Sequence, residues 1–191
     1  MSFLGVVKSF RSLFETKISY FSIMIFSYLM LFWILFYQIS NTTVQLYGDS
    51  YSYLNLPLGY SFKELFLSIR PVASVWMFRL FADPSNFPFA QMLIYTSSVM
   101  FLWWVLSRLV RSKLIFLFAC ICSVLFFTHS TFSIWLSGAL TEAVFFSLMV
   151  LALSFLLGII FRPGVFYTVG ATIVVVLLSL LRDVGAYYAA L

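Results

Sequence analysis

Long apolar stretches separated by shorter polar segments dominate the sequence. The apolar stretches cover residues 18–39, 87–110, 114–136, 141–161 and 165–181. Each is long enough to cross a hydrocarbon core of about 30 Å as an α-helix. The alternating pattern of a membrane β-barrel strand does not occur in them. The pattern therefore predicts an all-α integral membrane protein with about five transmembrane helices.

The segments outside these stretches predict two further helices at the membrane surface. Residues 1–17 place apolar side chains at roughly helical spacing with basic residues between them, which is typical of an amphipathic interfacial helix; a frayed tail is the alternative. Residues 40–86 form the longest break in hydrophobicity and are predicted to be an outer loop. Within this loop, residues 71–82 begin with Pro71 and are too short to cross, so we expect a helix on the outer surface.

Two of the apolar stretches end in polar residues. The third is apolar only as far as Phe127 and then continues through the letters THST, so its far end is expected to be polar or irregular. The fifth is followed by residues 182–191, which we interpret as the start of an outer segment. Binding or catalysis is expected in such breaks, because functional residues are concentrated outside the regular elements.

Composition supports membrane insertion and narrows the range of partners. The 191-residue chain is 63% hydrophobic and only 9% charged, which excludes a water-soluble globular domain. Its formal net charge is +5, but the 11 basic residues form no run and no stripe, so we expect membrane lipid and no nucleic acid as a partner. Cys120 and Cys122 point to different sides of a predicted helix and fit inert packing better than a metal site or a disulfide framework.

The positions of the basic residues predict the orientation of the helices. If the N-terminus is cytoplasmic, the inner side carries seven basic residues and one carboxylate, and the outer side carries four basic residues and five carboxylates. The inner basic residues are Lys8, Arg11, Lys17, Arg108, Arg111, Lys113 and Arg162. We therefore predict a multi-pass protein with a cytoplasmic N-terminus, in an inner or plasma membrane or in the endoplasmic reticulum.

Three charged positions on the outer side are candidate functional residues. Asp49 lies in YGDSYSYL beside Tyr51 and Tyr53, whose hydroxyls and rings suit a sugar; a turn aspartate is the alternative. Glu142 opens the fourth apolar stretch, where the helix dipole favours a carboxylate, so helix capping is its alternative role. Arg182 closes the fifth stretch, and its alternative role is to reach the lipid headgroups.

Other polar residues of the outer side carry weaker signals. His129 is the only histidine and has no second histidine or cysteine at ligand spacing, which argues against a metal site. Ordinary polar packing and contact with a substrate phosphate are both open for it. Arg70 and Arg79 belong to the outer loop and are of a type that binds phosphate. Asp83 precedes a proline and is interpreted as a turn residue.

The order of these parts resembles the GT-C superfamily of polytopic membrane glycosyltransferases, which take sugars from polyprenyl-phosphate donors. The resemblance rests on an early aspartate in GDSYSYL, the surface helix SIRPVASVWMFRLF, the span opened by LTEAVFFSLMVLALSF, and LLRDVGAYY at an outer span end. The last segment is similar to the Arg-Pro-x-Gly segments of these enzymes, with Asp183 in place of the usual proline. Family members have more spans and an outer domain, so the chain resembles either the N-terminal part of such an enzyme, which we favour, or a reduced relative.

The resemblance implies transfer of a sugar, with inversion, to an acceptor hydroxyl on the outer (periplasmic, extracellular or lumenal) face. It implies Asp49 as the general base. It implies that Arg182, with Arg70 or Arg79, holds the donor phosphate, and that Glu142 orients the acceptor or a basic partner. The lipid-linked sugar is a substrate and no cofactor is expected, while a requirement for a metal ion stays open.

Two other classes of function stay open. A transporter or channel subunit would place ionisable groups near the bilayer midplane, and none of the five stretches carries a charge near its centre. A structural or accessory membrane subunit would bind partner helices through its aromatic side chains, which make up 21% of the chain. The same side chains are equally compatible with ordinary contact with lipid.

Overall fold

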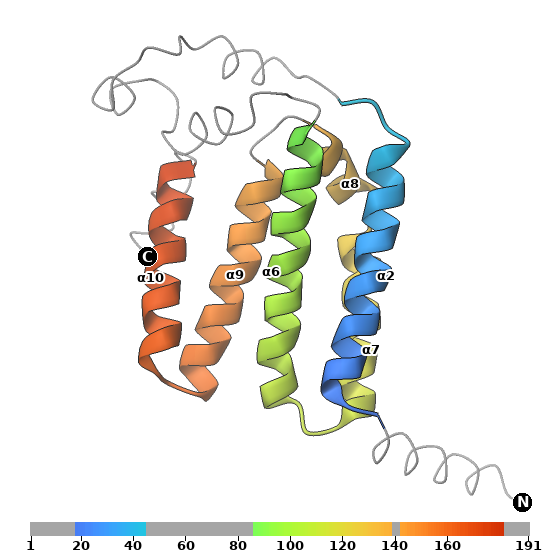
Figure 1. The fold of residues 1–191 in the computed structure, drawn as a ribbon. Coiled ribbons are helices and arrows are strands. Elements are labelled where there is room, and N and C mark those ends of the chain that lie inside the picture. The colour runs from blue at the N-terminus through green and yellow to red at the C-terminus, as the bar shows by residue number, and fades with distance from the viewer. Residues whose placement is uncertain (1–17, 45–85, 139–141, 182–191) are drawn as a thin grey trace, which may run out of the picture.

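The computed structural model describes residues 18–44, 86–138 and 142–181, which form an all-helical bundle with no strand in these ranges (Figure 1). The helices are α2 (Tyr20–Ser40), α6 (Phe87–Leu109), α7 (Lys113–Phe127), α8 (Ser130–Ser137), α9 (Glu142–Phe161) and α10 (Val165–Leu181). The helices predicted at 1–17 and 71–82 lie outside the described residues.

Within the described ranges, α2, α6 and α9 are each long and apolar enough to cross a membrane. They contain 21, 23 and 20 residues, which corresponds to about 30–35 Å at 1.5 Å per residue. The chain is therefore a membrane-embedded helical protein. α7 and α8 meet the same criteria only together, and they are inclined by 53° to each other. α10 is a shorter apolar helix of 17 residues.

Local sequence signals account for several helix ends. The Ser19 hydroxyl accepts a hydrogen bond from the N–H of Ser22 at 3.0 Å and so caps the start of α2. A proline, Pro88, lies in the first turn of α6, where its missing N–H costs no helical hydrogen bond. Pro163 follows α9 and separates it from α10, because a proline cannot continue the hydrogen-bonded ladder.

Successive helices alternate in direction, with α7 and α8 taken together as one bent segment. α6 packs between α2 and α9, α10 packs on α9, and α7 packs on α2 (Figure 1). The turns at 110–112 and 162–164 therefore lie at one end of the bundle. We call this end the basic end and the opposite one the Glu142 end, after the residue that begins α9 there. The described cations at the basic end are Arg108, Arg111, Lys113 and Arg162.

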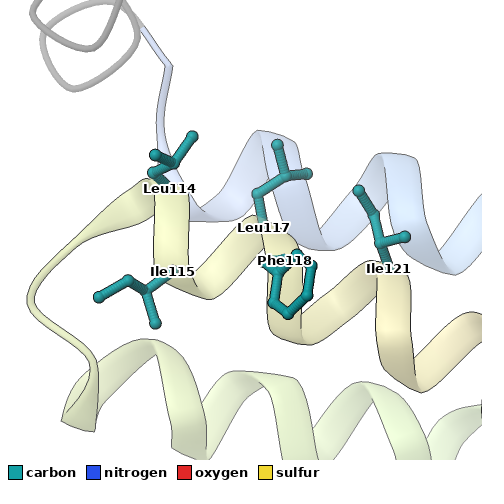
Figure 2. Close-up of a pocket in the computed structure, with 5 residues that line it drawn as sticks. All are labelled: Leu114, Ile115, Leu117, Phe118 and Ile121. Atoms are coloured by element: carbon teal, nitrogen blue, oxygen red, sulfur yellow. The ribbon is translucent and has the colours of Figure 1, made fainter. Parts of the chain in front are cut away.

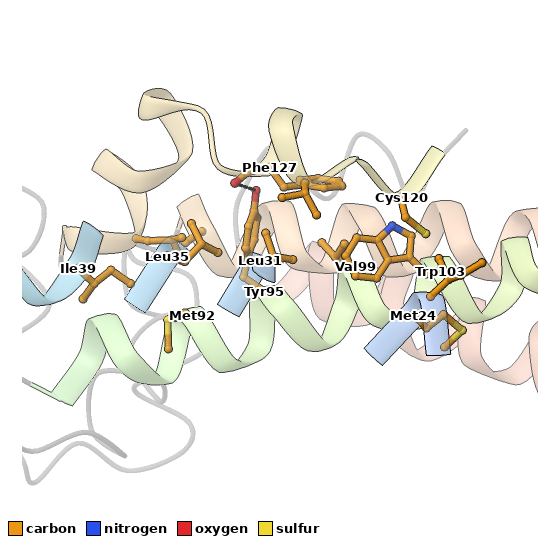
Figure 3. Packing of buried hydrophobic residues seen from close by; sticks show 14 of the residues in the cluster. Met24, Leu31, Leu35, Ile39, Met92, Tyr95, Val99, Trp103, Cys120 and Phe127 are labelled. Carbon is orange, nitrogen blue, oxygen red and sulfur yellow. Dashed lines mark hydrogen bonds between the residues drawn. The ribbon is translucent and has the colours of Figure 1, made fainter. Parts of the chain in front are cut away.

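α2, α6 and α7 share one apolar core (Figure 3). Leu31 and Leu35 of α2, Trp103 of α6 and Cys120 of α7 are all 0% exposed. Helix association in lipid depends on such close packing, because lipid tails remove the advantage of hiding apolar surface from water. Cys122 is exposed, which confirms that the two cysteines point to different sides of the helix.

Two glycines bring α9 and α10 into close contact. Gly158 of α9 faces the ring of Tyr167 in α10, and Gly170 of α10 faces the ring of Phe155 in α9. A methyl group added at either glycine would overlap the opposing ring. Each helix thus has a glycine that faces an aromatic ring of the other. Small residues are generally found where membrane helices approach closely.

The side chain of Tyr20 ties the start of α2 to the turn between α6 and α7. Its hydroxyl lies 2.8 Å from the carbonyl oxygen of Val110 and 2.7 Å from that of Arg111. Its ring meets Phe116 of α7 edge-on, with 5.3 Å between the centroids. Carbonyl groups beyond the end of a helix need partners of this kind, because the helix no longer supplies them.

Candidate functional site

The helices that directly precede two of the predicted site segments in sequence end at the Glu142 end of the bundle. α2 and α10 end there, and α6 and α9 begin there (Figure 1). Along the sequence, Asp49 follows Val44, the last described residue after α2, by five positions. Arg182 directly follows Leu181, the last residue of α10. The predicted base and phosphate ligand are thus connected to helices that end on the same side.

Six of the predicted site residues lie outside the described residues. They are Asp49, Tyr51, Tyr53, Arg70, Arg79 and Arg182. Their proposed roles stay predictions. The described part of the predicted site consists of Glu142 and His129, which belong to different helical segments.

Glu142 is the first residue of α9 and its side chain is partly buried. A carboxylate in a first turn is favoured by the positive end of the helix dipole, by about 0.3–1 kcal/mol at exposed positions and up to about 2 kcal/mol when partly buried. The neighbouring Val144 belongs to one apolar cluster with Phe87, the first residue of α6. The start of α9 is therefore held against the start of α6.

His129 lies in the break between α7 and α8. Its Nδ1 accepts a hydrogen bond from the N–H of Thr131 at 3.3 Å and lies 3.1 Å from the Thr131 hydroxyl. His129 thus caps the start of α8 while its side chain stays exposed. The structure therefore shows a structural role for the polar side chain of His129. Its contact with a substrate phosphate stays a prediction.

Side chains from two other helices satisfy the backbone at this break. The Tyr95 hydroxyl of α6 donates to the carbonyl oxygen of Phe127 at 3.2 Å (Figure 3), and Nε2 of Gln38 in α2 donates to that of Thr128 at 3.3 Å. An unpaired carbonyl in hydrocarbon costs several kcal/mol, so these donors allow the helix to break inside the bundle. The sequence pattern identifies neither donor. The signal that could have indicated one of them is Gln38 itself, a lone glutamine inside the first apolar stretch.

Charged residues of the described ranges are separated by sign along the bundle axis. All the described cations lie at the basic end, and the only described carboxylate, Glu142, lies at the opposite end. Arg108 packs its guanidinium over the ring of Trp104, with Cζ 5.3 Å from the ring centroid, which is a cation–π contact. No three histidine, cysteine or acidic side chains gather at a potential metal site in the described ranges.

Comparison of the chain with protein-family models, with curated proteins and with solved structures finds no match. The resemblance to glycosyltransferases therefore rests on the sequence segments quoted above. A functional hypothesis has to be supported by the chain's own residues, by the separation of charge along the bundle, and by the helix ends that meet at the Glu142 end.

Proposed function

We propose that the chain is a GT-C-type membrane glycosyltransferase, or the N-terminal part of one, which transfers a sugar from a polyprenyl-phosphate donor to an acceptor hydroxyl on the outer face. The separation of charge along the bundle carries the proposal. Because basic residues favour the cytoplasmic side, the basic end is the inner end and the Glu142 end is the outer end. The segments with Asp49 and Arg182 continue from that outer end, within reach of a donor whose tail lies in the bilayer.

We also propose that five helical segments cross the membrane, with a cytoplasmic N-terminus. α10 has 17 residues and covers about 25 Å, close to the thickness of the hydrocarbon core. It packs along α9 in the opposite direction, so a crossing by α9 brings α10 back across (Figure 1). α7 and α8 supply the remaining crossing with 15 and 8 residues on the two sides of the break.

In the proposed reaction, the acceptor oxygen attacks the anomeric carbon of the donor sugar, and the bond from that carbon to the donor phosphate oxygen breaks. Asp49 accepts the proton of the acceptor hydroxyl, which requires an approach of about 3 Å. Arg182, with Arg70 or Arg79, binds the departing phosphate and offsets its charge. Attack from the face opposite the phosphate inverts the anomeric centre. Glu142 orients the acceptor.

Three further residues complete the proposed substrate site. Tyr51 and Tyr53 stack on the pyranose ring and donate hydrogen bonds to its hydroxyls. His129 contacts the donor phosphate through Nε2, since the cap of α8 uses only Nδ1. The polyprenyl chain stays in the lipid beside the bundle, which explains a site at the end of the helices and not far out in water.

Substitution of Asp49 by asparagine tests the proposed base. We expect transfer to fall by roughly 10²–10⁴-fold, because an amide does not accept the acceptor's proton. The assay uses membranes containing the chain, a panel of radiolabelled polyprenyl-phosphate sugars, and an extract of acceptors. Immunoblotting of the membrane fraction measures expression and insertion.

A matched control is Asp83→Asn, which makes the same chemical change at a predicted turn of the same loop. It should keep wild-type transfer. Full activity of Asp49→Asn would remove Asp49 from the mechanism, and equal losses in both variants would point to the integrity of the loop instead. Absence of transfer by the wild type from every donor of the panel would favour the accessory-subunit alternative.

A further inference from the structure

An apolar groove runs along the outside of α7 and begins at the basic end of the bundle (Figure 2). Its volume is about 460 Å³. The described residues that line it are all apolar and all belong to α7: Leu114, Ile115, Leu117, Phe118 and Ile121. They cover about 10 Å along the helix axis, at 1.5 Å per residue. A groove with this lining suits a hydrocarbon chain.

Three basic residues precede this groove in the chain and lie at the same end of the bundle. Arg108 lies in the last turn of α6, Arg111 lies in the following turn, and Lys113 directly precedes the first lining residue. The side chains of both arginines are exposed, and no carboxylate of the described ranges lies at this end. α7 begins at Lys113, so the positive end of its helix dipole adds to the field of the three cations.

We propose that this groove binds an anionic phospholipid of the inner leaflet. One acyl chain lies along residues 114–121, and Arg108, Arg111 and Lys113 bind the phosphate of the headgroup. Arginine side chains suit this role, because the guanidinium group forms paired hydrogen bonds with phosphate oxygens. The lipid site lies at the end opposite the proposed catalytic site and does not depend on it.

Charge distinguishes this occupant from two other candidates for the groove. A second copy of the chain has the same orientation in the membrane, so it would bring its own basic end against the first. The N-terminal segment carries Lys8, Arg11 and Lys17 against a single glutamate, so it is also positive. Both would add positive charge to a positive surface, whereas an anionic lipid neutralises it.

Native mass spectrometry of the purified full chain tests the proposal. The protein is incubated in detergent with equal amounts of phosphatidylglycerol and phosphatidylcholine that carry the same acyl chains, and the retained lipid is counted. We expect the wild type to prefer phosphatidylglycerol. Each neutralised cation should lower the preference about fivefold, so Arg108→Gln, Arg111→Gln and Lys113→Gln together should abolish it.

Arg162→Gln is the matched control for charge, because Arg162 lies at the same end but in the turn between α9 and α10. It should leave the preference unchanged. Equal retention of both lipids by the wild type, retained selectivity in the triple variant, or an equal loss in Arg162→Gln would overturn the proposal. Gel filtration shows whether each variant is folded and whether a second copy excludes the lipid, which would also overturn it.

A second pair of variants tests the apolar half of the site and does not alter charge. Ile115 lines the groove and is 62% exposed, whereas Leu125 lies on the same helix outside the groove and is 65% exposed. Ile115→Trp should fill the groove and lower lipid retention several-fold, and Leu125→Trp should not. Glycerophosphoglycerol, which has the headgroup with its single negative charge but no acyl chains, should not displace the lipid at equal concentration. Displacement, or equal effects of the two tryptophans, would contradict the role of the groove.

Discussion

Tyr95 packs its ring in the apolar core of the bundle and also forms a hydrogen bond there. It is 1% exposed, and its ring meets that of Phe127 edge-on at 5.7 Å between the centroids. Its hydroxyl donates to the Phe127 carbonyl at the end of α7. Because Tyr95 is buried in the apolar core, loss of its hydroxyl leaves the carbonyl without that partner in an apolar environment.

Tyr95→Phe should therefore lower the free energy of unfolding by about 0.5–1.5 kcal/mol, the range for a hydrogen bond between membrane helices. Thermal or SDS-induced unfolding of the purified protein, followed by circular dichroism, measures the change. Tyr37→Phe is the control, because Tyr37 is 66% exposed on α2 and loses an equivalent hydroxyl at the surface. Equal stability of both variants would show that the bond to Phe127 contributes nothing.

At the level of helices, the sequence pattern predicts the lengths of the helices better than the contacts between them. Residues 165–181 were expected to form one apolar stretch and are helical over the same range, since Pro163 and Arg182 interrupt the pattern on either side. The letters THST predicted an irregular end to the third stretch. The 53° change of direction there depends on donors from α2 and α6 that lie more than 30 residues away in sequence, and no local pattern contains them.

The same division between local and distant information applies to the candidate site. The place of Glu142 in the first turn of α9 could be read from the apolar run that follows it. Its position against the start of α6 could not, because that depends on the packing of Phe87 with Val144.

The α9–α10 pair gives a prediction at this scale. Gly158→Ser should destabilise the protein by about 1–3 kcal/mol, because its Cβ overlaps the Tyr167 ring and the two helices have to move apart. Unfolding in SDS measures the loss. Gly164→Ser is the matched control, because a Cβ at Gly164 meets only the Arg162 carbonyl oxygen, at 3.9 Å.

Removal of the opposing ring checks the cause. Tyr167→Ala should be less harmful in the Gly158→Ser background than in the wild type, because the overlap no longer exists. Simple additivity of the two changes would mean that the serine acts in some other way. A loss in Gly164→Ser as large as that in Gly158→Ser would have the same meaning.

The molecule as a whole exposes apolar side chains over its sides. Phe26 and Trp33 of α2, Phe118 of α7 and Phe166 of α10 are all at least 60% exposed. A water-soluble bundle would bury such side chains, whereas in a membrane they contact the lipid tails. Charged residues of the described ranges are confined to the two ends, as the apolar sides require.

The proposed orientation predicts which end of the bundle is accessible from outside. In a background with Cys120→Ser and Cys122→Ser, single cysteines are placed at exposed positions of opposite ends, Asn41 and Gly164. A membrane-impermeant maleimide should label Asn41→Cys in intact cells, and Gly164→Cys only after the membrane is disrupted. The reverse pattern would invert the topology and move the proposed catalytic site to the cytoplasm.

The break between α7 and α8 also has a consequence for the order of synthesis. Gln38 and Tyr95, which donate to the carbonyl groups at the break, precede Phe127 and Thr128 in the chain. Chains fold from the N-terminus as they are made, so α2 and α6 enter the bilayer before the broken segment does. Its two carbonyl groups thus follow both of their donors into the bilayer, so the least regular part of the bundle is made after the side chains that stabilise it.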